Sequence, residues 1–135
     1  MSPNLPASRY NQIGPKRAGS YSVQGSKATD IEWRVSVALD RLNIPYLFQY
    51  EVGGGRTTRG GIVLDFLAIT SPLSTPIDVR GEYWHRARHK IDDDLGLALL
   101  NHYGRGQYAE PVVLYGGELQ TLDQAFATVK RELRI

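Results

Sequence analysis

One apolar stretch in the middle of the chain constrains the fold more than any other feature. Residues 62–69 read Ile-Val-Leu-Asp-Phe-Leu-Ala-Ile, so Asp65 is the single polar side chain among them. A strand that is apolar on both faces is typical of a central position in a sheet. A buried carboxylate is costly there unless a metal ion, a basic residue or a hydrogen-bonding loop compensates it. We therefore expect Asp65 to belong to a functional site, with a purely structural carboxylate as the alternative.

Helix and strand patterns surround this stretch in the order α-β-β-β-α-β-α. The capping-box pattern Thr29-Asp30-Ile31-Glu32 predicts the start of a helix that reaches about residue 43. Strands are expected at 46–52, 62–69, 77–80 and 111–115, and further helices at 88–103 and from Thr121 onward. This order predicts an α/β fold in which helices flank a mixed sheet.

The first 28 residues differ from the rest in composition. They are rich in Ser, Gly, Pro, Asn and Gln, show no apolar period, and carry four cations before the first acid: Arg9, Lys16, Arg17 and Lys27. This pattern predicts a flexible basic arm over residues 1–28 and a folded domain over residues 29–135. The arm suits contact with nucleic acid; a solubilising tail, or a segment draped over a partner subunit, is the alternative.

The composition excludes several classes of protein. The 135 residues carry a formal net charge of +2 and no cysteine, which excludes disulfides, thiol nucleophiles and thiolate zinc sites. No apolar run approaches the roughly 18–20 residues of a membrane span, and the N-terminus lacks a signal-peptide core. We therefore expect a cytoplasmic protein without a membrane partner.

A second acid follows Asp65 after thirteen residues. Asp78 lies in Ile77-Asp78-Val79-Arg80, where strand alternation places Asp78 and Arg80 on one face. Two carboxylates from adjacent strands form a hard oxygen site that suits Mg²⁺ or Mn²⁺, and a backbone carbonyl between them can add a ligand. The alternative is a surface ion pair between Asp78 and Arg80 on an edge strand, which contributes little stability.

Aromatic, imidazole and cationic side chains are concentrated in residues 81–90, Gly-Glu-Tyr-Trp-His-Arg-Ala-Arg-His-Lys. His85 is suited to accept a proton from an attacking water at neutral pH. Three cations, Arg86, Arg88 and Lys90, are expected to bind phosphates. Two aromatic residues, Tyr83 and Trp84, are expected to stack on bases. Singly, these residues fit a core Trp, a solvated charge run and a surface His. Together they favour a phosphate-handling site.

Three other features have open interpretations. The Gly-rich residues 53–61 predict a mobile basic turn, which adds Arg56 and Arg59 to the candidate DNA contacts. The acids at 92–94 either favour a helix dipole or include one that orients His85 or binds a metal. Glu32 is already explained by the capping box.

Several of these stretches together resemble a known family. They are residues 29–34, 38–46 and 62–66, the stretch Gly81-Glu82-Tyr83-Trp84-His85, and the ending at 112–119. In order and spacing they are similar to the very-short-patch-repair endonucleases and the related phage homing endonucleases of the PD-(D/E)XK nuclease superfamily. The resemblance extends from Thr29 to Leu119, and residues 81–85 are its most specific part.

The resemblance implies a restriction-endonuclease-like fold and a Mg²⁺-dependent DNA endonuclease. It assigns the metal-binding aspartate to Asp65 and the backbone carbonyl ligand to Val79. It assigns the catalytic histidine to His85, the acid of the first helix to Glu32 and a downstream aspartate to Asp93. It also places Asp78 at the second acid of the superfamily, Arg80 at its lysine, and Tyr83 and Trp84 at aromatics that wedge into DNA. The cysteine ligands of the structural zinc in the repair enzymes are missing.

Two functions are therefore expected from the sequence. The first is a metal-dependent endonuclease that hydrolyses phosphodiester bonds in DNA with Mg²⁺ or Mn²⁺. The alternative is a catalytically inactive nuclease-like fold that serves as a phage structural or DNA-binding protein, in a homo-oligomer or a viral assembly, and is then associated with the virion.

Overall fold

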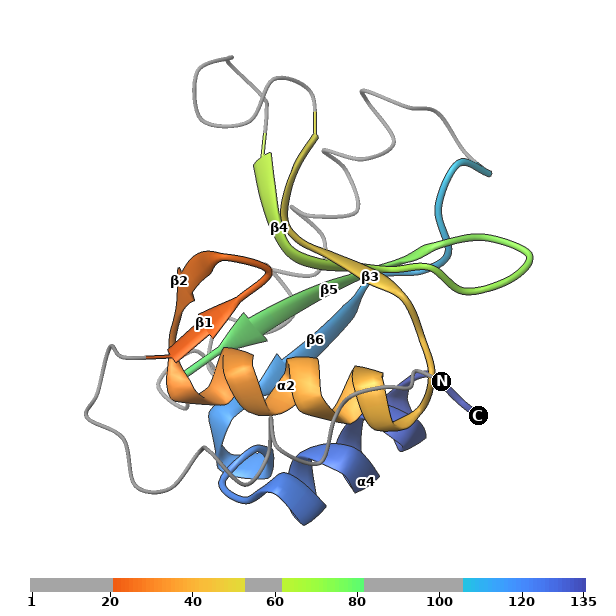
Figure 1. Ribbon diagram of the computed structural model, residues 1–135. Helices are drawn as coiled ribbons and strands as arrows, with labels where there is room; N and C mark the ends of the chain where they lie inside the picture. Colours follow the sequence, from red (N-terminus) through yellow and green to blue (C-terminus); the bar gives the residue numbers. More distant parts are fainter. Residues whose placement is uncertain (1–20, 53–61, 82–105) are drawn as a thin grey trace.

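The computed structural model describes residues 21–52, 62–81 and 106–135 (Figure 1). The elements in these ranges are, in chain order, β1 (Tyr21–Val23), β2 (Ser26–Ala28), α2 (Asp30–Arg41), β3 (Tyr46–Val52), β4 (Ile62–Ala68), β5 (Thr75–Arg80), β6 (Val112–Tyr115), the 3₁₀ turn η3 (Gly116–Glu118) and α4 (Leu122–Glu132). The basic turn expected at 53–61 and the helix expected at 88–103 lie outside the described residues.

A mixed four-stranded sheet in the order β3-β4-β5-β6 is the centre of the fold. β4 pairs antiparallel with both β3 and β5, whereas β5 and β6 run parallel. The prediction that the apolar stretch 62–69 forms a central strand is confirmed, because β4 lies between β3 and β5. The prediction of a mixed α/β fold is confirmed as well.

Both described helices pack against one face of this sheet and against each other (Figure 1). The core between them includes Leu39 of α2, Val129 of α4, Phe66 of β4 and Ile77 of β5, all fully buried. The apolar residues recur at helical spacing in both helices because each helix places one apolar stripe against the sheet. None of the helices in the described ranges has the length and apolar character needed to cross a membrane.

The β1–β2 hairpin corrects the expected flexible basic arm for residues 21–28, while residues 1–20 of that arm lie outside the described residues. Its turn residues, Gln24 and Gly25, have φ values of 49° and 83°, and two positive values are typical of the type I′ turn of a tight hairpin. Val23 and Ala28 are buried in the main core. The folded part therefore begins by Tyr21. The sequence pattern did not reveal this hairpin, because two three-residue strands with one buried position each are too short to show a period.

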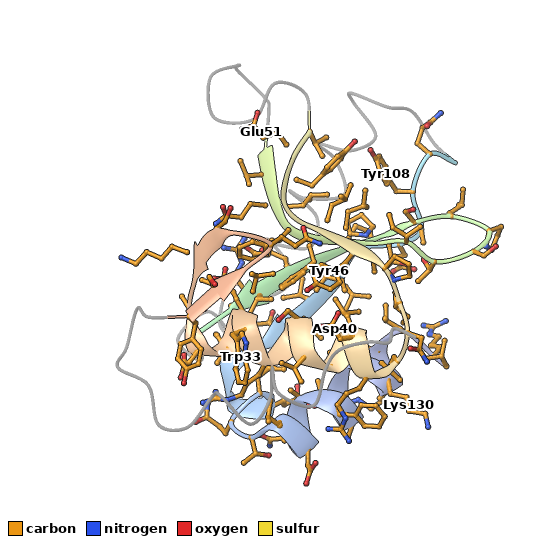
Figure 2. All side chains as sticks on the ribbon, in the orientation of Figure 1. Trp33, Asp40, Tyr46, Glu51, Tyr108 and Lys130 are labelled. Carbon is orange, nitrogen blue, oxygen red and sulfur yellow. The ribbon has the colours of Figure 1, made fainter. Side chains whose placement is uncertain are left out.

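Aromatic stacking joins this hairpin to the first helix. The Tyr21 ring centroid lies 5.1 Å from that of Trp33, which is in the first half of α2 (Figure 2). The hairpin and α2 therefore share one apolar contact at the end of the helix where Glu32 also lies.

The β3–β4 pair bends at the level of Asp65. Gln49 has a φ of 54°, and the register on either side of it places it opposite Asp65. Beyond this point the two strands curve together away from the helices (Figure 1). A second apolar cluster forms there around Val52 and Leu64, and Tyr108 packs against it on the side of the strands away from the helices (Figure 2).

Candidate metal centre

The carboxyl groups of Asp65 and Asp78 meet between β4 and β5. The last backbone pair between these strands is Phe66 with Ile77, so Asp65 and Asp78 are the next residues along each strand. Their side chains are hydrogen-bonded to each other. The structure therefore brings together the two acids that the sequence places thirteen residues apart.

The side chain of Asp65 continues the strand pairing where the backbones separate. The amide nitrogen of Val79 donates a hydrogen bond of 2.6 Å to Oδ2 of Asp65. A metal ion, a basic residue or a hydrogen-bonding loop was expected to compensate Asp65. In the described residues a backbone hydrogen bond from the next strand has this role. Val79, expected to offer its carbonyl to a metal, contacts Asp65 through its amide.

Arg80 forms an ion pair with Asp78, at 2.5 Å between Nη2 and Oδ2. The side chain of Asp78 is 8% exposed, and β5 lies between β4 and β6. The alternative of a surface ion pair on an edge strand is therefore wrong about its location, because the strand is internal and the carboxylate is buried. A buried carboxylate depends on this partner far more than an exposed one does.

Burial and the neighbouring acid raise the pKa of Asp65 to about 8. Desolvation is the largest cause, followed by the hydrogen bond and the negative charge of Asp78; the Val79 amide acts in the opposite direction. Near neutral pH the pair therefore retains one proton, which the two carboxyl groups share in their hydrogen bond. The pair carries one negative charge, which faces Arg80.

Glu32 adds a second negative charge near this pair. The capping box predicted for it is confirmed: the Thr29 amide donates to Oε1 of Glu32 at 2.8 Å, and the Glu32 amide donates to Oγ1 of Thr29 at 3.2 Å. Its charge also contributes to the raised pKa of Asp65. Glu32 therefore has two roles, a cap for α2 and an electrostatic neighbour of the acid pair.

Gly116 shows how closely the surrounding elements approach one another. A Cβ atom at this position would lie 3.5 Å from the Arg80 carbonyl oxygen and 3.7 Å from the end of the Ile31 side chain. The carboxyl ends of β5 and β6 therefore converge on the first turn of α2. The first turn of α2, which includes Glu32, therefore lies near the end of the strand that carries Asp78 and Arg80.

The donor chemistry of the pair fits a hard divalent cation. Two carboxyl groups in contact present oxygen ligands of the kind that Mg²⁺ and Mn²⁺ prefer, and a cation between them would take the place of the shared proton. Within residues 21–52, 62–81 and 106–135, no group of three or more His, Asp or Glu side chains is placed to hold a metal.

Most of the other predicted site residues lie outside the described residues. These are the catalytic candidates His85 and Asp93 and the DNA-binding candidates Arg9, Lys16, Arg17, Arg56, Arg59, Tyr83, Trp84, Arg86, Arg88 and Lys90. Lys27 is described and is exposed on β2.

Sequence reasoning missed Tyr115 as a neighbour of the site. This residue pairs in register with Arg80 across the parallel β5–β6 ladder, and it is buried. The signal was present in the final strand, because Val113 and Tyr115 alternate on the same face as Asp78 and Arg80.

Comparison of the chain with protein-family models, curated proteins and solved structures gave no match.

Proposed function

We propose that this chain is a metal-dependent DNA endonuclease of the PD-(D/E)XK type. The observation that carries the proposal is the contact between Asp65 and Asp78, two acids from adjacent internal strands. A buried acid pair is destabilising unless a proton or a cation neutralises it. A divalent ion provides that neutralisation and also supplies the chemistry that phosphodiester hydrolysis needs.

The arrangement of elements supports this assignment. A helix, three antiparallel strands, a fourth strand parallel to the third and a last helix follow one another in the described residues. Parallel strands need a crossover connection of a dozen or more residues. The 31 positions between β5 and β6 are enough for it, and they contain the residues 81–85 that carry the most specific part of the resemblance.

The proposed mechanism assigns one task to each residue. Asp65 and Asp78, with the Val79 carbonyl, would hold the ion, which would polarise the phosphate and lower the pKa of a water molecule. His85, oriented by Asp93, accepts the proton of the attacking water. Arg80, beside Asp78, stabilises the negative charge that develops on the phosphate, and Glu32 maintains the negative potential that attracts the cation.

Cleavage assays with the full chain test this proposal. Supercoiled plasmid and single- and double-stranded oligonucleotides are incubated with Mg²⁺, with Mn²⁺ or with a chelator. The expected result is nicking or cutting that requires the metal and is abolished by Asp65→Asn and by His85→Ala. Asp123→Asn is the matched control, because it makes the same change at an exposed carboxylate of α4 and should leave cleavage unchanged.

A thermal melt gives a second readout that does not depend on finding the right DNA. Mg²⁺ or Mn²⁺ should raise the Tm of the parent by linkage, and Asp65→Asn should lose this shift. If the parent shows neither a metal-dependent Tm shift nor cleavage of any DNA form, the catalytic proposal fails.

The ion pair between Asp78 and Arg80 favours a second candidate. Because Arg80 already neutralises Asp78, and the two carboxyl groups share a proton, the acid pair is compensated by the chain itself. The alternative is therefore a catalytically inactive nuclease-like domain that binds DNA or takes part in a phage assembly. Metal-independent DNA binding, without cleavage and without a metal-dependent Tm shift, would support this candidate.

A further inference from the structure

The ion pair between Arg80 and Asp78 occupies the carboxyl group that the proposed metal site needs. Nη2 of Arg80 lies 2.5 Å from Oδ2 of Asp78, and this oxygen atom is buried. The same carboxyl group is hydrogen-bonded to Asp65. A Mg²⁺ ion lies about 2 Å from its oxygen ligands, and its positive charge repels a guanidinium group. Arg80 and a divalent cation therefore compete for Asp78.

The two members of this ion pair differ in their freedom to move. The side chain of Asp78 is short and buried, and it extends from an internal strand of the sheet. The side chain of Arg80 is long and 33% exposed, so part of it already lies in solvent. Exposed side chains change rotamer rapidly and without a change in the backbone. Separation of the pair is therefore a movement of Arg80, whereas Asp78 stays in place.

Arg80 has a reason to stay on Asp78 only while that carboxylate lacks another cation. Removing one member of a buried ion pair leaves an uncompensated charge, which is strongly destabilising. Once Asp78 is neutralised by a divalent cation instead, this penalty disappears and the guanidinium group is free to bind an anion. Its planar set of N–H donors matches the oxygen atoms of a phosphate group.

We propose that Arg80 is an exchangeable counter-ion, which pairs with Asp78 in the metal-free protein, leaves it when a divalent cation binds there, and then binds a phosphate group of the substrate. The proposal rests on the proposed nuclease function and gives Arg80 two successive partners. Because Arg80 reaches an anion only after it has left Asp78, cation binding and phosphate binding should strengthen each other.

NMR of the arginine side chains in the ¹⁵N-labelled full chain tests the first step. The Arg80 guanidinium signals are assigned by their loss in Arg80→Lys. On addition of Mg²⁺ we expect the N–H groups of Arg80 to exchange with solvent about tenfold faster, as the loss of one charged hydrogen bond implies. The guanidinium of Arg131, which lies 2.6 Å from Glu118, is the internal control and should not change. If Mg²⁺ raises the Tm of the parent while the Arg80 signals stay the same, the exchange is overturned and the nuclease proposal stands.

Calorimetric titration with Mg²⁺ measures the competition directly. In Arg80→Gln the competitor is gone, so we expect the Kd for Mg²⁺ to be about tenfold lower than in the parent. Arg131→Gln removes the same charge from another ion pair and should leave the Kd unchanged. Arg80→Lys keeps a cation that lacks the planar fork, so it should give an intermediate Kd even if Arg80→Gln folds poorly. Mg²⁺ binding that is equal in the parent, Arg80→Gln and Arg80→Lys overturns the competition.

Inorganic phosphate, which cannot be cleaved, tests the second partner. Phosphate should bind the parent at least about fivefold more tightly with Mg²⁺ than without it, and Arg80→Gln should lose most of this coupling. Equal coupling in both proteins overturns the assignment of phosphate to Arg80. If neither the parent nor Arg80→Gln binds Mg²⁺, the metal site itself is overturned, and the exchange with it.

Discussion

A carboxyl group that shares its proton with a neighbour makes folding stability depend on pH. Asp65 has a pKa of about 8 in the folded chain, against 3.8 for an unperturbed aspartate. The folded state therefore binds a proton more tightly than the unfolded state. The stabilisation that comes from the tighter binding of this proton is complete below about pH 4 and is lost as the pH rises toward about 8.

The first residue-scale prediction follows from this difference. Without metal, the free energy of unfolding should fall between about pH 5 and pH 7, with up to about 1.4 kcal/mol per pH unit from Asp65. In Asp65→Asn this part of the slope should vanish, because an amide can still accept from Val79 and donate to Asp78 without titrating. Urea unfolding at a series of pH values measures it, and an unchanged slope in the variant would contradict the assignment.

At the scale of the element, the first turn of α2 combines a structural and an electrostatic role in one side chain. Glu32 completes the capping box and also raises the pKa of Asp65. A substitution that preserves the cap but removes the charge separates these roles.

Glu32→Gln is that substitution, because Gln is an equally good capping-box residue. We expect the stability at acidic pH to stay close to that of the parent and the pKa of Asp65 to fall, which NMR titration of its carboxyl carbon measures. Thr29→Ala, in contrast, should cost about 1 kcal/mol through the lost cap. Thr121→Ala is the matched control: it removes the cap of α4 at a similar cost and should leave the pKa of Asp65 unchanged.

At the scale of the whole molecule, the β1–β2 hairpin belongs to the core rather than to an arm. Val23 is fully buried among residues of the sheet and helices, and Tyr21 stacks on Trp33. A truncation at residue 28 would therefore remove part of the core along with the basic residues.

This placement predicts the result of shortening the chain. A chain that starts at Thr29 should melt at a lower temperature than one that starts at Tyr21, since it lacks two buried side chains and the hydrogen bonds from the Gln24 side chain to β3. Val23→Ala in the full chain should cost about 2 kcal/mol through lost apolar burial. Ser22→Ala is the matched control at an exposed position of the same strand. Equal melting temperatures for the two truncations would show that the hairpin adds nothing to the core.

The sequence alone determined the elements that have a strong local signal. The capping box of α2, the apolar stretch of β4 and the stripe of α4 each depend on neighbours within a few residues, so their patterns are readable without tertiary information. The apolar character of β4 on both faces also predicted its internal position. Asp65 and Asp78 were identifiable because a charged residue in an apolar strand is conspicuous.

Only the tertiary structure decided how these residues are combined. Contact between Asp65 and Asp78 depends on the register of β4 with β5, and the internal position of the Asp78–Arg80 ion pair depends on β6 lying beyond β5. The hairpin and the Gln24 contact depend on a partner 22 residues or more away along the chain. No local pattern encodes such pairings, because their free energy arises from burial and hydrogen bonding between segments that meet only in the folded chain.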